Sequence, residues 1–298
     1  MRKFLYKAGI FLAGLIVINL LLYYFISKPV LYDEYLPQKK KLIQYHKFLF
    51  SDSHGYVVPH IYLENLGIFN FSYGSDTYVD MYFKLDYLYR KELIPDTILI
   101  TADDHTLSKY RSEFNNKDRS IRYSSFKSYK KFYDINFLSY IYNKYLKIYL
   151  PMLNSNNSQL FQRYIKSLIS PENQIVPQWE KVKNKEQECI DRKEYQFPND
   201  SISVVNRKGL MEIISLTNEY GTELIGIKFP LTGDFLKVLE NANYKADSII
   251  HSIGSPVYDY KFKFHEMDTF FYDQDHIDSA GSRVFVKMLY DDILNPTK

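Results

Sequence analysis

Residues 47–55 constrain the fold of this chain more than any other stretch. An apolar, strand-like run stops abruptly at small and polar residues, and Gly55 then opens a helix-compatible continuation. In an open parallel α/β sheet, ligands bind at the carboxyl ends of the strands, because the strand-to-helix turns expose side chains there. Ser53 in such a turn is therefore a candidate nucleophile. A serine hydroxyl needs a base to remove its proton, and the base needs a carboxylate to orient it.

A second segment, near the other end of the chain, supplies a histidine and a carboxylate. Asp273 and His276 stand three residues apart, just before a helix-like stretch at 282–289. We interpret Asp275 as a solvated neighbour of His276 and not as its partner. A serine in a strand-to-helix turn is also a common helix cap, so Ser53 alone does not indicate catalysis. The catalytic interpretation depends on both segments, one of which opens the predicted domain while the other closes it.

The two segments together resemble the SGNH (GDSL-type) hydrolases. Residues 51–54 read Ser-Asp-Ser-His, similar to the Gly-Asp-Ser block that opens these enzymes, with Ser51 in the place of glycine. Asp273-x-x-His276 matches their closing Asp-x-x-His block. The resemblance implies Ser53 as nucleophile, His276 as base and Asp273 as its orienting carboxylate. It also implies a three-layer α/β/α fold with a parallel, flavodoxin-like sheet, and it covers roughly residues 46–108 and 205–298.

The family's oxyanion donors are matched only in part. They are the backbone N–H of the nucleophile, here Ser53, a backbone N–H at a glycine after the second strand, here Gly74, and an asparagine side chain after the third strand. This chain has Asp103 where the third block has asparagine, and an ionised carboxylate only accepts hydrogen bonds. His105 is a weaker candidate for the missing donor. The departure leaves room for a transferase or a degenerate site.

Two further residues of the serine block have supporting roles in this interpretation. We expect Asp52 to brace the loop through backbone N–H groups. We expect His54 to pack or hydrogen-bond near the turn.

The order of the segments indicates a substrate class. A membrane anchor followed by this domain and a Tyr-rich body, with 29 Tyr in 298 residues, is closest to relatives that add or remove O-acetyl groups on cell-envelope polysaccharides, as in the alginate O-acetyltransferase group. Tyr rings can stack on sugars, although many serve in ordinary packing. The resemblance implies a carbohydrate substrate, no cofactor and no metal. For a transferase it also implies a membrane-bound protein that donates the acyl group.

Two other interpretations use the same residues. The first is a metallophosphoesterase, because Asp52-x-His54 resembles the opening block of calcineurin-type enzymes, and the Asp and His residues of 103–105 and 273–276 offer further ligands. The remaining blocks of that class are missing. The second is a non-catalytic envelope scaffold or glycan-binding protein with a vestigial site.

The N-terminal segment predicts a membrane anchor. Residues 9–26 form an apolar run broken only by Asn19, about the length that a spanning helix needs. Three basic residues precede the run, and Lys28 is the only one in the next ten, which places the N-terminus in the cytoplasm and the rest outside. Residues 25–29 lack a small-residue cleavage site, so we expect an uncleaved anchor and not a signal peptide.

Composition excludes several other classes. A net charge of +3 is close to balance, so the composition lacks the excess of basic residues that is typical of nucleic-acid-binding proteins. The single cysteine, Cys189, rules out an internal disulfide framework and a Cys-based metal cage. It also lies too far from the N-terminus to carry a lipoprotein anchor.

The remaining pattern predicts an α/β domain with a parallel sheet. Short apolar runs bounded by turn residues alternate with helical patterns, which favours right-handed crossovers. We expect strands at 47–50, 65–71, 97–100, 223–229 and 256–260, and helices at 77–90, 209–220 and 234–244. The predicted organisation is a cytoplasmic segment 1–8, an anchor 9–27, a linker 28–45 and a domain 46–298, which holds a largely helical insertion at about 109–205 with helices at 137–149 and 158–169.

Overall fold

The computed structural model describes residues 1–32, 35–37, 39–150, 178–198 and 201–295. The chain forms two compact units, one of Met1–Gln38 with Lys117–Ile175 and one of Lys39–Asn116 with Val176–Lys298. We call them the N-terminal unit and the sheet unit. The described residues of the predicted insertion fall in both units and hold several short helices joined by turns. The helix expected at 158–169 lies outside the described residues.

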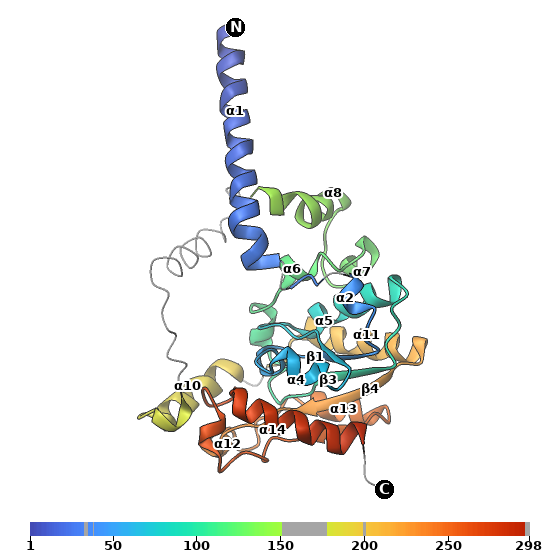
Figure 1. Cartoon of the computed structure of the whole chain (residues 1–298), viewed down its shortest axis with the longest axis vertical. Helices are drawn as coiled ribbons and strands as arrows, with labels where there is room; N and C mark the ends of the chain where they lie inside the picture. Colours follow the sequence, from blue (N-terminus) through green and yellow to red (C-terminus); the bar gives the residue numbers. More distant parts are fainter. Residues whose placement is uncertain (33–34, 38, 151–177, 199–200, 296–298) are drawn as a thin grey trace. The chain divides into compact units, whose positions relative to one another are not determined.

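A five-stranded parallel sheet forms the centre of the sheet unit (Figure 1). The strands are β1 (Lys47–Phe50), β2 (Ile68–Asn70), β3 (Thr97–Thr101), β4 (Glu223–Lys228) and β5 (Val257–Asp259). Their order is β2-β1-β3-β4-β5, and every neighbouring pair is parallel. This is the order of flavodoxin-like doubly wound sheets. The expected parallel α/β sheet is therefore confirmed.

The central strands are short apolar runs because both of their faces are covered. Phe48, Leu49 and Phe50 of β1 are at most 1% exposed, and so are Ile98 and Ile100 of the neighbouring β3. Strands buried on both faces lose the alternation of apolar and polar residues that marks a half-exposed sheet. This burial explains why the strands could be located from continuous apolar runs.

Helices connect the strands, and the two longest of this unit begin at N-capping residues. α5 (Tyr78–Arg90) starts with a capping box in which Thr77 and Asp80 bond each other's backbone N–H. α11 (Val204–Tyr220) is capped by Ser203 and ends at Gly221, whose φ of 68° is left-handed. The other helices of this unit are α2 (Lys39–Leu42), α3 (Ser53–Tyr56), α4 (His60–Glu64), η2 (Lys109–Ser112), η6 (Trp179–Lys181), α10 (Lys185–Gln196), α12 (Gly233–Leu239), α13 (Ala246–Ser252), η8 (Asp268–Phe270), α14 (Ser279–Leu289) and η9 (Tyr290–Leu294).

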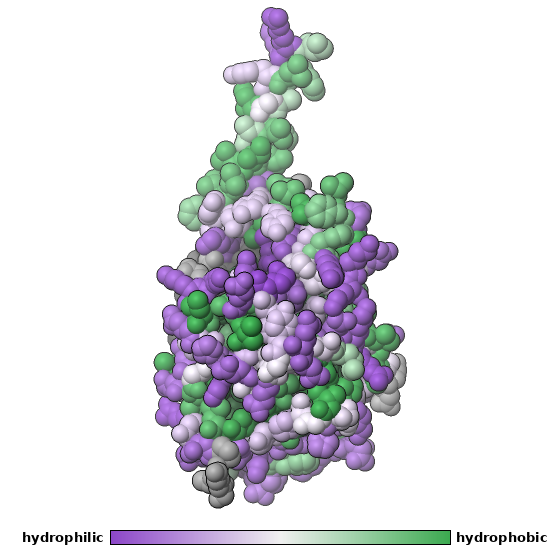
Figure 2. Space-filling model, turned by 90° about the vertical axis from the view of Figure 1, so that its right-hand side faces the viewer, coloured by the Kyte–Doolittle hydropathy of each residue, from purple (hydrophilic) through white to green (hydrophobic). Residues whose placement is uncertain are grey.

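The regular elements in the described part of the N-terminal unit are helices, joined by turns. It holds α1 (Arg2–Leu22), η1 (Tyr23–Tyr32), α6 (Lys117–Ser120), α7 (Phe126–Lys130), α8 (Phe137–Ile141), η3 (Tyr142–Leu146) and η4 (Lys147–Tyr149). The 24-residue stretch Arg2–Phe25 is long and apolar enough to cross a membrane. Figure 2 shows hydrophobic side chains along most of this helix and hydrophilic ones at its N-terminal end. The helix begins before the apolar run, and the expected linker at 28–45 is itself partly helical in η1 and α2.

Candidate functional site

The candidate site lies at the carboxyl ends of the strands, where the strand order reverses. β1 pairs with β2 on one side and with β3 on the other, so the reversal falls between β1 and β3. Ligands of doubly wound sheets bind at this point, because the connections on its two sides diverge and leave a crevice. Asp52 and His54 follow β1, and Asp103 and His105 follow β3. A loop before α14 adds His276, whose ring centroid lies 5.1 Å from that of His54.

The serine of the first turn is not the cap of its helix. The N-cap of α3 is Asp52, whose carboxylate accepts the His54 N–H at 3.0 Å. Ser53 is the first helical residue, is half-buried, and its hydroxyl bonds to none of the residues that the structure describes. Gly55 allows a close approach, because a Cβ there would lie 2.5 Å from the Cβ of Ser51. Ser53 therefore does not stand in this turn as a helix N-cap, which is the common structural role of a serine there.

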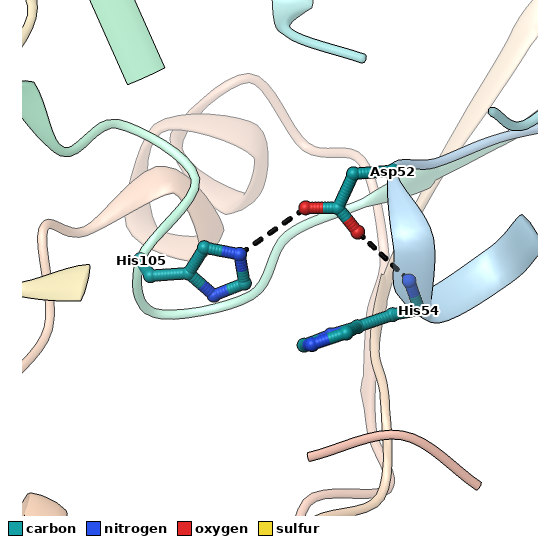
Figure 3. Close-up of side chains that lie close together, drawn as sticks. All are labelled: Asp52, His54 and His105. Atoms are coloured by element: carbon teal, nitrogen blue, oxygen red, sulfur yellow. Dashed lines mark hydrogen bonds and ion pairs between the residues drawn. The ribbon is translucent and has the colours of Figure 1, made fainter. Parts of the chain in front are cut away.

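Asp52 ties the turn after β1 to the turn after β3. Figure 3 shows its carboxylate between the backbone N–H of His54 and the ring of His105, with 3.1 Å to Nε2 of His105. The Arg111 guanidinium lies 3.3 Å from the same oxygen. Burial would raise the pKa of this carboxyl, but His54, His105 and Arg111 outweigh it and hold the pKa well below its usual range. Asp52 is therefore a charged, fully buried brace.

His54 occupies the centre of the cluster. It is 3% exposed, its Nδ1 lies 2.7 Å from a carboxylate oxygen of Asp103, and its Nε2 lies 3.5 Å from Asp275. Its ring contacts those of His105 and His276, each with centroids 5.1 Å apart. Burial would lower the pKa of His54, but Asp103 and Asp52 raise it well above its usual value. His54 is therefore held as a cation among carboxylates.

Asp273 and His276, which the sequence suggested as orienting carboxylate and base, lie in direct contact. Nδ1 of His276 lies 2.9 Å from both carboxylate oxygens of Asp273, and one of these oxygens also accepts the His276 N–H at 2.8 Å. Nε2 of His276 is buried and has no hydrogen-bond partner in the described part of the chain. The pair thus presents an oriented imidazole with one free nitrogen. No hydrogen bond joins His276 to Ser53 in this structure.

Two carboxylates set the charge of His276. Burial would lower its pKa, but Asp275 and Asp273 outweigh burial and raise the pKa to about 9. The imidazole is therefore mostly protonated at neutral pH in the resting state.

The interpretation of Asp275 as a solvated residue is wrong. Its side chain is fully buried and lies 3.1 Å from Nδ1 of His276. Arg192 of α10 binds it with two hydrogen bonds, of 2.9 and 2.7 Å, and Gln196 adds one of 2.6 Å. Burial would raise the pKa of Asp275, but the charges of His276 and Arg192 and the hydrogen bonds with His276 and His54 outweigh burial and hold this pKa well below its usual range.

Sequence reasoning missed three residues of the cluster, Arg111, Arg192 and Gln196. Arg192 and Gln196 lie on α10, in a polar stretch that matches no part of the family pattern, and Arg111 lies in η2. No spacing or motif distinguishes them from surface residues of the same types. Only the folded arrangement brings them to the buried carboxylates.

The turn after β2, which holds Gly74, is rigidly supported. The side chain of Asn116 donates to the carbonyl of Gly74 at 2.8 Å and to Asp76 at 2.7 Å. Lys84 of α5 donates to the Phe71 carbonyl at 2.7 Å and pairs with Asp76 in the interior. The backbone N–H of Gly74 donates no hydrogen bond within the described residues. It therefore remains available to an incoming ligand.

Replacing Gly74 with valine is expected to harm activity more than folding. A Cβ at Gly74 meets nothing within 4 Å, so the fold tolerates the side chain, whereas a substrate approaching the N–H does not. We expect a loss of activity of at least about tenfold, whereas the free energy of unfolding, measured by thermal unfolding, should change by less than about 1 kcal/mol. Gly55→Ala is the control, because its Cβ would clash with Ser51 and should impair folding. Equal losses of stability in both variants would make Gly74 purely structural.

The side chains of the third block bond to other groups of the site. Asp103 accepts the Phe229 N–H at 2.8 Å and the Thr101 hydroxyl at 2.8 Å, in addition to its contact with His54. Asp104 pairs with Lys228 at 2.5 Å and with Lys261 at 2.8 Å. His105, the weaker candidate, has Nε2 bonded to Asp52.

Two groups of side chains have the composition of metal sites. Asp52, His54 and His105 form one, and His54, Asp275 and His276 form the other, each with ligand atoms within 4.8 Å of one another. A metal needs neutral imidazoles and unpaired carboxylates. Here the pKa of His54 and of His276 is raised, and Arg111 and Arg192 already face the carboxylates. The donor set therefore fits a divalent cation poorly.

Comparison with models of known protein families gave no match, and comparison with the sequences of curated proteins gave none either. The functional assignment therefore rests on the residues of the two motifs and on the geometry of the cluster.

Proposed function

We propose that the chain is a serine-dependent acyl-ester enzyme of SGNH type, with Ser53 as nucleophile, His276 as base and Asp273 as orienting residue. The observation that carries the proposal is the Asp273–His276 pair, which holds Nδ1 at 2.9 Å and leaves Nε2 buried and unbonded. A triad base has this arrangement, because the carboxylate fixes the tautomer and the other nitrogen takes the proton. The neighbouring turn carries Ser53, whose hydroxyl has no structural task.

The fold agrees with this proposal. The sheet order β2-β1-β3-β4-β5 places the serine turn beside the point where the strand order reverses. We extend the assignment to the three-layer α/β/α arrangement of the SGNH type.

The reaction follows from the roles of these groups. Oγ of Ser53 attacks the ester carbonyl while Nε2 of His276 takes the hydroxyl proton, and the backbone N–H groups of Ser53 and Gly74 stabilise the oxyanion. The leaving alcohol then takes the proton from His276, and an acyl-enzyme remains. Water or a sugar hydroxyl attacks the acyl-enzyme, with His276 again as base, and restores Ser53. Hydrolysis and transfer differ only in this acceptor.

The surroundings of the cluster support a carbohydrate substrate. Tyr110, Phe114 and Tyr195 form an aromatic cluster, with ring centroids 5.0 to 6.3 Å apart, and Tyr110 also contacts the ring of His105 at 6.2 Å. Phe114 and Tyr195 are more than 40% exposed. Exposed aromatic faces beside a polar site suit sugar rings, which combine C–H faces with hydroxyls. With α1 as an uncleaved anchor and the N-terminus in the cytoplasm, the substrate is cell-envelope polysaccharide.

The partners follow from the same proposal. The domain lies outside the membrane, and a transferase would receive its acyl group from a membrane-bound donor protein. No nucleic-acid partner is expected.

The nucleophile can be tested by labelling the full chain with a fluorophosphonate, which reacts with activated serines. We expect covalent label on Ser53, no label after Ser53→Ala, and strongly reduced label after His276→Gln. A chain that stays unlabelled between pH 6 and pH 10 would contradict the proposal and favour the scaffold, for which the missing asparagine donor is the best argument. Ester or phosphoester activity that survives Ser53→Ala but not a chelator would favour the metallophosphoesterase.

The activity is expected to rise with pH up to about pH 9. Only neutral His276 can accept a proton, and its pKa of about 9 leaves a small neutral fraction at pH 7. The value of kcat/KM should therefore increase by about tenfold per pH unit below pH 8 and level off above pH 9. Asp275→Asn removes a carboxylate that raises this pKa, so the rise should move to lower pH. A profile that is flat between pH 6 and pH 10 would exclude His276 as the base.

A further inference from the structure

The helix from Phe137 to Tyr149 exposes one aromatic and apolar face. It consists of α8, η3 and η4, which follow one another directly, and it belongs to the N-terminal unit. Six large side chains of this helix are 39–80% exposed, and we call them the aromatic face: Phe137, Leu138, Tyr142, Tyr145, Leu146 and Tyr149. Isolated apolar residues on a surface are ordinary, but a contiguous set of this kind marks a binding surface.

The opposite side of the helix is fixed against α7 and the residues before it. Tyr140 is 3% exposed, its hydroxyl donates to the Ser124 carbonyl at 2.8 Å, and its ring contacts those of Phe126 and Tyr129 at 5.4 and 5.6 Å. Lys144 is also buried and donates to the Tyr140 hydroxyl at 3.0 Å. The rotation of the helix about its own axis is therefore set, and the aromatic face cannot turn inward.

The aromatic face ends, at Tyr149, beside the C-terminal part of the candidate membrane helix. The ring of Tyr149 lies 4.6 Å from that of Tyr23, which stands near the C-terminal end of Arg2–Phe25. Within this unit, Figure 1 draws α8 roughly crosswise to α1. A helix that lies in a membrane surface has this orientation relative to a helix that spans the same membrane.

The composition of the helix fits the membrane–water interface. Tyr and Phe gather at the level of the lipid headgroups, where a ring is apolar and a hydroxyl stays wet. Residues 137–149 include no Asp or Glu that would repel anionic headgroups. Of their two basic residues, Lys144 is buried and Lys147 pairs with Asp118 at 3.2 Å, so the aromatic face itself carries no charge.

We propose that the aromatic face lies in the headgroup layer of the membrane that α1 crosses, at a depth of about 5–10 Å. The occupant of this surface is lipid, because the face adjoins the end of the span itself. The proposal rests on α1 as an anchor and does not depend on the ester chemistry of the sheet unit.

Depth-dependent fluorescence quenching tests the proposal on the full chain in lipid vesicles. Cys189, which is buried, is replaced by alanine, and single cysteines at Leu138 or Tyr145 carry an environment-sensitive fluorophore. Lipids spin-labelled near the headgroup or near the end of the acyl chain serve as quenchers. Val17, in the middle of the apolar run, is the control for a spanning position, and Glu219, which is exposed on α11, is the control for water.

We expect the probes at Leu138 and Tyr145 to be quenched about twofold more by the headgroup-proximal label than by the deep label. The probe at Val17 should show the reverse order, and the probe at Glu219 should respond to neither. Quenching at Val17 alone would overturn the interfacial position and leave the anchor intact, whereas no quenching at any position would overturn both. Probes at Tyr145 that escape lipid quenching but transfer energy between copies would assign the face to a second copy of the chain.

Discussion

Replacing Ser53 with alanine is expected to lower the proposed acyl-ester activity by at least about 10⁴-fold and to leave the stability of the chain unchanged. Removing a triad nucleophile costs this much because no other group can form the acyl-enzyme. The stability should hold because the Ser53 hydroxyl bonds to none of the described residues and Asp52 caps the helix in its place. Release of acyl groups from acetylated polysaccharide or a chromogenic ester measures the activity, and thermal unfolding in detergent measures the stability.

Ser51→Ala is the matched control for this variant. Ser51 is fully buried, and its hydroxyl accepts the Gly55 N–H at 3.1 Å, so its loss should cost about 1 kcal/mol of folding free energy. The alanine substitution should therefore lower the activity at Ser53 and the folding stability at Ser51. Unchanged ester activity in Ser53→Ala would remove the serine mechanism altogether.

The strands of the sheet could be predicted because burial leaves a direct trace in the sequence. Phe48 and Leu49 of β1, like Ile98 and Leu99 of β3, belong to unbroken apolar runs that only a strand covered on both faces allows. Gly221 ends α11 in a left-handed conformation, which the order of helix, glycine and strand anticipated. The parallel arrangement then followed from the alternation of strands and helices.

The division of the chain into two units could not be predicted in the same way. The described residues 117–150 group with the N-terminal helix and not with the sheet unit, which precedes and follows them in the chain. Contacts such as that between Tyr23 and Tyr149 are between residues far apart in sequence. The abundance of Tyr gives no indication of which rings meet.

The candidate site was predictable only where the local chain carries the chemistry. Asp273 and His276 are three residues apart, so one loop can hold them together, and the motif names both. The burial of Asp275 depends on Arg192, which is 83 residues away in sequence and lies on a helix without a recognised pattern. The sequence shows a carboxylate next to a histidine, but it does not show which distant cation compensates its burial.

Arg192→Met is expected to destabilise the sheet unit by about 2–4 kcal/mol. The substitution keeps the apolar stem of the side chain but leaves the fully buried Asp275 with Gln196 and the histidines as its partners. Removing one member of a buried ion pair is costly because the other charge remains desolvated. The effect should appear as a lower midpoint of thermal or urea unfolding of the full chain in detergent, with the m-value unchanged.

Two further variants separate this cause from a general loss of packing on α10. Lys185→Met changes another cation of the same helix, whose partner Asp268 is a third exposed, and should cost less than about 1 kcal/mol. Asp275→Asn combined with Arg192→Met removes both charges, so the double variant should be more stable than the sum of the single effects by about 1–3 kcal/mol. Additive effects would mean that Arg192 contributes through its stem alone. In that case the charge of Asp275 would be compensated by His54 and His276, and α10 would have no electrostatic part in the site.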